Sequence, residues 1–229
     1  MNLETDLADL KAKRGYLLPH HGLLAMTAPN LLAGYDAAYT ALALEDRVLS
    51  HHDREFVWLA ILIAADEAHA THHIAKFHAA HGTPEELAAV LRLTATVCGF
   101  RAFRFTQEHW KTLLPEVDVP AEWRRAVTAA GEGAPPDLVQ MAACTVQICM
   151  GDWEGLRWQL RDAYAAGVDE MALSEALSLT MFPASVPYFV TTAQIWREMI
   201  RAGELDATEP FLTWAHFPGQ GGHGGGPDD

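Results

Sequence analysis

Apolar residues recur along the chain in helical runs separated by short polar or glycine-containing segments. The most apolar run is FVWLAILIAA at residues 56–65. It is too short to span a bilayer, which needs about 20 residues, and we expect a helix buried on all sides. Asn-Gly hairpin turns and sustained alternation are absent, so strands are not expected. The pattern predicts an all-α protein with helices near residues 2–13, 29–46, 52–65, 67–81, 84–97, 100–112, 120–131, 136–150, 152–166, 169–181 and 187–202.

The predicted helices fall into two similar series. A constant offset aligns residues 55–110 with residues 140–196 and places Gly82 on Gly167, with one residue inserted near the end. In both series an apolar helix precedes a helix that ends in alanines, a glycine and an acidic helix start. We therefore predict two tandem helical units that form one domain. The predicted boundaries are 1–47 for an N-terminal helical segment, 48–115 and 116–205 for the two units, and 206–229 for a Gly-rich, disordered tail.

The residues between the predicted helices have the composition of helix ends. Gly82 and Gly167 are expected just after a helix, at positions where the backbone takes a positive φ. Thr83 and Glu86 flank Pro84 in a sequence typical of a capping box, which indicates that a helix begins there.

Charge and cysteine usage restrict the partners and the compartment. The formal net charge is −14, and nucleic-acid binding, which depends on clustered Lys and Arg, is not expected. The first residues lack the apolar stretch of a secretory signal, and we expect no membrane partner. The three cysteines form no Cys-x-x-Cys pair, which favours reduced thiols and a cytoplasmic location.

The segment LSHHDREFVWLAILIAADEAHATHHIAKFHAAHGTPEELAAVLRL at residues 49–93 resembles the core of the carboxymuconolactone decarboxylase family, in the alkylhydroperoxidase D superfamily. The features that carry the likeness are an Arg-Glu pair, an apolar helix, a helix with His, and a Glu-rich helix start after a glycine. The resemblance covers residues 30–112 and, more loosely, 120–200. It implies an all-α fold and a homo-oligomer of three or more chains.

The resemblance also assigns positions to the family's chemistry. In the peroxidase branch a Glu, a Cys-x-x-Cys pair and a His carry the reaction. These positions fall in the first unit on Glu55, Glu67, Ala70 and Ile74, and in the second on Gln140, Asp152, Gly155 and Gln159. Because both units lack the cysteines, a Cys-dependent peroxidase is disfavoured. The resemblance instead implies a cofactor-free lyase or decarboxylase that acts on a small carboxylated or oxygenated ring compound, with its site in the first unit.

A histidine cluster lies in the same segment, with five His in residues 66–81. We expect Glu55 and His73 to share proton transfer, with support from His69 four residues before His73. The residues expected to bind substrate are Arg101, Arg104 and His72.

Two alternatives remain open for this cluster. In one, the protein is a metal-dependent enzyme or metal-binding protein in which His69, His73 and Glu67 hold a divalent ion. In the other, the histidines carry no chemistry and the chain is a non-catalytic helical scaffold.

The catalytic interpretation sets a geometric condition. In one unbroken helix over residues 52–81, Glu55 and His73 would be about 27 Å apart, because each residue rises about 1.5 Å. The chain must therefore turn back between them, and Asp66 is the predicted N-cap of the second helix.

Overall fold

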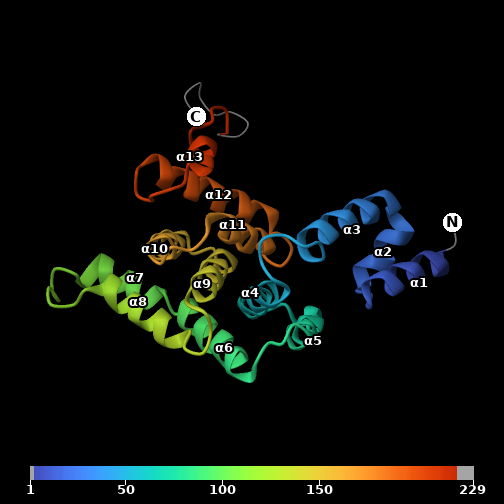
Figure 1. Cartoon of the computed structure of the whole chain (residues 1–229), viewed down its shortest axis with the longest axis horizontal. Coiled ribbons are helices and arrows are strands. Elements are labelled where there is room, and N and C mark those ends of the chain that lie inside the picture. The colour runs from blue at the N-terminus through green and yellow to red at the C-terminus, as the bar shows by residue number, and fades with distance from the viewer. Residues whose placement is uncertain (1–2, 221–229) are drawn as a thin grey trace. The chain divides into compact units, whose positions relative to one another are not determined.

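The computed structural model describes residues 3–220 (Figure 1). Within this range every regular element is a helix and no strand is present, which confirms the all-α prediction. The chain divides into two compact units, Met1–Asp46 and Arg47–Asp229. No helix of residues 3–220 has both the length and the apolar character needed to cross a membrane.

The first unit contains α1 (Leu3–Arg14), α2 (Pro19–Thr27) and α3 (Pro29–Ala43). The buried side chain of Arg14 at the end of α1 pairs with Asp36 on α3, with 2.6 Å between Nη2 and Oδ1. The sequence pattern did not predict α2. It begins at a proline, which fits the first turn of a helix because that turn needs no amide hydrogen.

The first series of helices in the second unit begins after Ser50, whose hydroxyl accepts a hydrogen bond from the Asp53 amide and caps α4. Its elements are α4 (His51–Ala64), the 3₁₀ turn η1 (Ala68–Ala70), α5 (His72–Ala79), α6 (Pro84–Cys98), α7 (Arg101–Phe105) and the π-helical η2 (Thr106–Trp110).

The remaining elements are α8 (Val119–Ala130), α9 (Pro136–Met150), α10 (Trp153–Ala165), α11 (Glu170–Ser178), η3 (Leu179–Met181), α12 (Val186–Arg201) and α13 (Glu209–His216). The last of these corrects the prediction that residues 206–229 are disordered, since α13 forms inside that segment. Its Phe211 and Trp214 rings pack against Trp196 of α12, which gives the helix an apolar anchor. Residues 221–229 lie outside the described residues.

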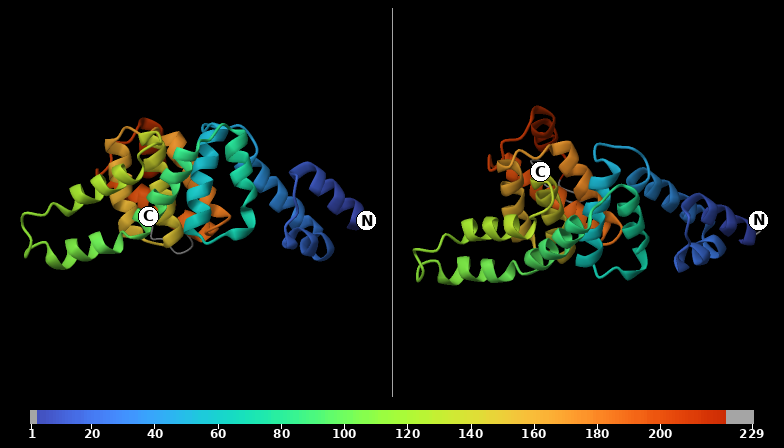
Figure 2. Two further views of the ribbon diagram at one scale, coloured as in Figure 1. Left: turned by 90° about the horizontal axis from the view of Figure 1, so that it is seen from below. Right: turned by 60° about the horizontal axis from the view of Figure 1, so that its bottom comes forward.

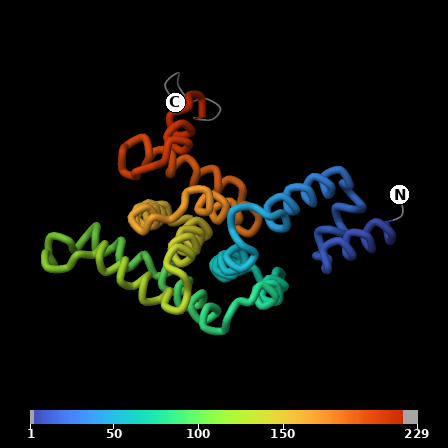
Figure 3. The backbone as a smooth tube through the Cα atoms, in the orientation of Figure 1, coloured from blue at the N-terminus to red at the C-terminus, as the bar shows by residue number. Residues whose placement is uncertain are grey.

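The core of this unit lies around α4 and α9, which run side by side near the centre of Figure 1. α6 packs against both helices, and α10 packs against α9 (Figures 2 and 3). Residues 54–62 of α4 are all buried, so the prediction of burial for the apolar run 56–65 is confirmed up to Leu62, whereas Ile63 is 45% exposed. The helix is therefore a central element of the fold.

The helix starts follow the spacing of the predicted repeat in part. α4 begins at His51 and α9 at Pro136, and α6 begins at Pro84 and α11 at Glu170. Between these helices the first series has η1 and α5, whereas the second has α10 alone. That the two series are copies of one unit stays a prediction.

The two glycines that align the series have different roles. Gly167 has a φ of 74°, as predicted for a residue just after a helix. The prediction for Gly82 is wrong, because the preceding residue, His81, takes the positive φ of 68°. Gly82 lies so close to the Phe77 ring that a Cβ atom would overlap it. The capping box between Thr83 and Glu86 is present as predicted.

The chain turns back between α4 and α5 without a glycine or a proline. α4 ends at Ala64, and Asp66 has a φ of 53°. Glu67, not Asp66, caps the next element: its carboxylate accepts the His69 amide hydrogen at 2.7 Å. The predicted helix over 67–81 is therefore divided into η1 and α5. After this turn α5 lies against α4.

Candidate active site

The turn between α4 and α5 brings Glu55 and His73 into direct contact. Their Oε2 and Nδ1 atoms are 2.6 Å apart, although 18 residues separate them in sequence. Glu55 is 5% exposed and His73 is 2% exposed. A short contact in a site from which water is largely excluded is a strong, oriented interaction.

The contact has a defined direction when Glu55 is ionised. A carboxylate only accepts hydrogen bonds, so Nδ1 of His73 then carries the hydrogen that Glu55 accepts. In the neutral ring the lone pair then lies on Nε2. The arrangement gives His73 one nitrogen to exchange a proton and gives Glu55 the charge that stabilises the protonated ring.

Two rings pack against His73. The Trp58 indole on α4 stacks on the imidazole with 4.7 Å between ring centroids and an angle of 26°. Trp58 is 2% exposed, and among the described residues its Nε1 donor has no hydrogen-bond partner. Trp58 lies one helical turn after Glu55, and this spacing is the sequence signal that could have identified it. Trp58 was not among the residues predicted for the site.

His72 is the second of these rings, with 4.4 Å between the His72 and His73 centroids. Burial, together with the nearby His73 and Lys76, lowers the pKa of His72 to about 4. His72 is therefore neutral near pH 7. It can exchange hydrogen bonds with a bound molecule but does not supply a positive charge.

The structure does not bring His69 to this pair. His69 is exposed and belongs to η1, so the i, i+4 spacing from His73 is broken by the start of α5 at His72. Glu67, the third ligand of the metal alternative, uses its carboxylate on the His69 backbone. Within residues 3–220, no group of three His, Cys, Asp or Glu side chains is arranged to hold a metal ion.

The two arginines expected to bind substrate also lie elsewhere. Arg101 is exposed, and Arg104 donates through Nη1 to both carboxylate oxygens of Asp152, at 3.0 and 3.1 Å. Both belong to α7, which packs on α8, whereas α5 packs on α4 (Figure 1). Arg104 therefore links α7 to the N-terminus of α10.

An apolar cavity of about 500 Å³ lies between α4, α5 and α6. Leu59 lines it and lies one helical turn after Glu55, while Ile74 lines it from the position next to His73. Ile74 and Glu67 also occupy positions at which the family's peroxidase branch has a His and a Cys. The cavity therefore lies beside the Glu55–His73 pair, and the chemical groups of that branch are replaced there.

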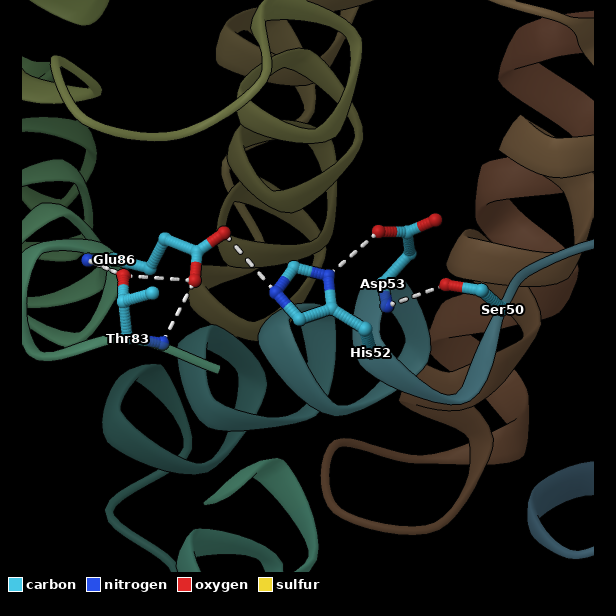
Figure 4. A network of polar contacts seen from close by, with 5 residues as sticks. All are labelled: Ser50, His52, Asp53, Thr83 and Glu86. Carbon is cyan, nitrogen blue, oxygen red and sulfur yellow. Dashed lines mark hydrogen bonds and ion pairs between the residues drawn. The ribbon is translucent and has the colours of Figure 1, made fainter. Parts of the chain in front are cut away.

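A second histidine network joins the starts of α4 and α6 (Figure 4). His52 contacts Asp53 through Nδ1 at 2.9 Å and Glu86 through Nε2 at 3.0 Å. Burial lowers the pKa of His52, but the hydrogen bonds to the two carboxylates outweigh it and the net shift is upward. Burial raises the pKa of Glu86, while hydrogen bonds from Thr83 and His52 bring it below its ordinary value. Since Glu86 is also in the capping box, this network stabilises helix ends.

The second series has an amide pair at the positions that correspond to Glu55 and to Ile74, the residue next to His73. The Gln159 side chain on α10 donates to Oε1 of Gln140 on α9. These are the positions that the family alignment gives to the Glu and the His of the second unit. Amides do not exchange protons near neutral pH, so this pair offers no acid or base.

The three cysteines are poor nucleophiles in this structure. Burial raises the pKa of Cys144 and Cys98, and raises that of Cys149 to about 12. Thiols of this kind are protonated near neutral pH, and the thiolate is the reactive form. That the protein is not a Cys-dependent peroxidase stays a prediction.

These features define an all-helical protein with a buried carboxylate–imidazole pair beside an apolar cavity. Residues 29–108 match the family model of the carboxymuconolactone decarboxylase family. The match confirms the resemblance seen in the sequence and assigns this segment, which holds Glu55, His73 and the cavity, to the family. Searches among curated proteins and among solved structures found no match.

Proposed function

We propose that the protein is a carboxymuconolactone decarboxylase-like lyase or decarboxylase that acts on a small carboxylated or oxygenated ring compound. Glu55 and His73 form its acid/base pair, and the reaction needs no cofactor. The observation that carries the proposal is the 2.6 Å contact between the two side chains in a buried site. The family match to residues 29–108 supports the reaction class.

The pair can perform both proton transfers of such a reaction. In the base step, Nε2 of His73 removes a proton from a ring carbon next to a carbonyl group, and Glu55 stabilises the imidazolium that forms. In the acid step, the imidazolium returns a proton to ring carbon, including the carbon left with an electron pair when CO₂ departs. Positioned acid/base groups of this kind contribute roughly 10²- to 10⁴-fold to the rate.

The base step can be tested with 5-nitrobenzisoxazole, a neutral ring compound that opens to a coloured phenolate when a base removes its C3 proton and the N–O bond breaks. We expect Glu55→Gln and His73→Gln each to lower kcat/KM by about 10²-fold or more. The matched controls are Glu85→Gln and His78→Gln, which change exposed residues of α6 and α5 and should keep wild-type turnover.

Wild-type turnover no greater than that of the two site variants would contradict the proposal and would favour the non-catalytic scaffold. The acid step is tested by CO₂ release from a panel of carboxylated lactones, measured with the same four variants. A substrate from this panel whose turnover survives both site substitutions would also contradict the assignment of Glu55 and His73.

A further inference from the structure

We propose that the cavity between α4, α5 and α6 is the substrate pocket of this site and selects an apolar ring compound with a hydroxyl or amine group over a carboxylate. This inference rests on the proposed function, within which it favours a lyase that acts on an oxygenated ring compound over a decarboxylase. It is carried by the position of the cavity, the apolar character of its wall and the sign of the charges at its edge.

The cavity and the acid/base pair share one face of α4. Glu55, Leu59 and Leu62 follow one another at intervals of four and three residues, which places them in one row along the helix. Leu59 and Leu62 line the cavity. The cavity therefore begins about one helical turn, or roughly 5.4 Å along the helix axis, beyond Glu55.

The wall of the cavity suits an apolar ring. Its volume of about 500 Å³ falls in the range of roughly 300–1,000 Å³ that is usual for small-molecule sites. α5 contributes Ile74, and α6 contributes Leu87 and Leu91. Ile74 is 45% exposed and Leu91 is 59% exposed, so the cavity opens to the surface and a ligand can reach it.

The charged residues that line the cavity within the described chain are Asp66 and Glu67, and both are acidic. The turn holds them at the edge of the cavity: Asp66 by its φ of 53° and Glu67 by the hydrogen bond from the His69 amide. Carboxylates repel a group of like charge and accept hydrogen bonds from a hydroxyl or an ammonium group.

The cations that could reverse this preference lie elsewhere. Arg104 is paired with Asp152, and α7, which carries it together with Arg101, packs on α8. Lys76 is close enough to His72 to lower its pKa, but it is not among the residues that line the cavity. The charged side chains that line the cavity within the described residues are therefore both negative.

Binding of three matched probes to the full-length protein tests this selection. They are 2-naphthylmethylamine, 2-naphthalenemethanol and 2-naphthoate, which share one ring system and differ in the polar group. We expect calorimetry to give a Kd for the amine and the alcohol at least tenfold lower than the Kd for the naphthoate. In the double variant Asp66→Asn with Glu67→Gln the amine should lose most of that preference, while the amide introduced at position 67 keeps an oxygen for the His69 hydrogen.

A second test fills the cavity with a larger side chain. Ala68 lines the cavity and is exposed, so Ala68→Phe should raise the Kd of the amine at least tenfold without unfolding the protein. Ala165→Phe, at an exposed position of α10, should leave the Kd unchanged. Equal or tighter binding of the naphthoate, or unchanged amine binding in Ala68→Phe, would overturn the inference. Loss of self-association in Ala68→Phe without loss of probe binding would overturn it too, because the cavity wall would then be an interface between copies.

The binding experiment can succeed or fail independently of the turnover experiment that tests the proposed function. Binding needs no turnover, so Glu55→Gln should bind the amine with a Kd within about threefold of wild type. If Glu55→Gln also keeps its turnover, the proposed function fails while the ligand site stands.

Discussion

At the scale of single residues, two histidines of the same helical series show how their surroundings divide their roles. His73 is almost fully buried, and its Nδ1 contacts one carboxylate. His52 is 23% exposed in its side chain and uses both nitrogens on Asp53 and Glu86. The first arrangement suits chemistry, whereas the second fixes two helix ends.

The His52–Glu86 pair should therefore affect stability rather than turnover, in a defined pH range. The raised pKa of His52 stabilises the fold below 6.5, and this contribution is lost as the pH rises through the folded-state pKa. The lowered pKa of Glu86 stabilises the fold above 4.5, and this contribution is lost as the pH falls through its folded-state pKa. The pair stabilises most between these two values.

We expect His52→Gln to lower the free energy of unfolding by about 1 kcal/mol near pH 5.5. The difference from wild type should be smaller at pH 8 and at pH 3.5, as measured by urea unfolding. His78→Gln serves as the control because His78 is exposed on α5. A difference that does not vary with pH would show that the two side chains are not coupled in this way.

The sequence indicated some of these residues and not others. It identified Glu55 and His73 as partners because a family position and a histidine-rich segment coincide. It could not place His69, since whether His69 and His73 share a face depends on where the helix restarts. The stacking of Trp58 on His73 follows from the packing of α5 on α4, which no local pattern specifies.

At the scale of helices, the break after α4 decides the geometry of the site. The pattern predicted a turn near Asp66, but the cap is Glu67 and the helix restarts only at His72. Asp66 takes a φ of 53° without being a glycine. Short polar residues tolerate this conformation, so the sequence allowed the turn but did not require it.

A buried ion pair holds the start of α4 against α11. Arg54 and Glu175 are both 1% exposed in their side chains, with 3.2 Å between Nε and Oε1. Oε2 of Glu175 also accepts the amide hydrogens of Val48 and Leu49, at 2.6 and 2.9 Å. The Glu175 carboxylate therefore accepts the backbone amide hydrogens of the segment before α4, and its ion pair with Arg54 joins the two helical series.

Removing the negative charge of Glu175 should destabilise the fold. We expect Glu175→Gln to lower the free energy of unfolding by roughly 3–5 kcal/mol, because it leaves the Arg54 charge buried. Chemical denaturation followed by circular dichroism measures this change. The control is Glu198→Gln, which removes an exposed ion pair with Arg157 and should cost less than about 1 kcal/mol. Similar losses in the two variants would contradict a special role for the buried pair.

At the scale of the whole molecule, the sequence predicted the helical class and most helix positions, because the apolar spacing is regular and the caps are clear. It missed α2 and α13. Both are short and begin at or next to proline, and both lie in segments whose composition is typical of loops. What stabilises α13 is contact with Trp196, a residue of another helix.

The segment between the two compact units should be the first site of proteolysis. Glu45 to Val48 are exposed and outside any helix, which is the usual setting for nicking. We expect limited digestion with Glu-C to cut first after Glu45 and to release fragments 1–45 and 46–229, identified by mass spectrometry. A first cut within α4 to α6 would contradict the division at Asp46.

The hydrogen-bonded amides of Gln140 and Gln159 bear on how much activity a single substitution should remove. A chain with two equivalent active sites would keep half of its turnover after one site is inactivated. The amide pair of the second series cannot replace the proton transfer that we propose for Glu55 and His73. We therefore expect a single change at Glu55 to reduce turnover to the background and not to half.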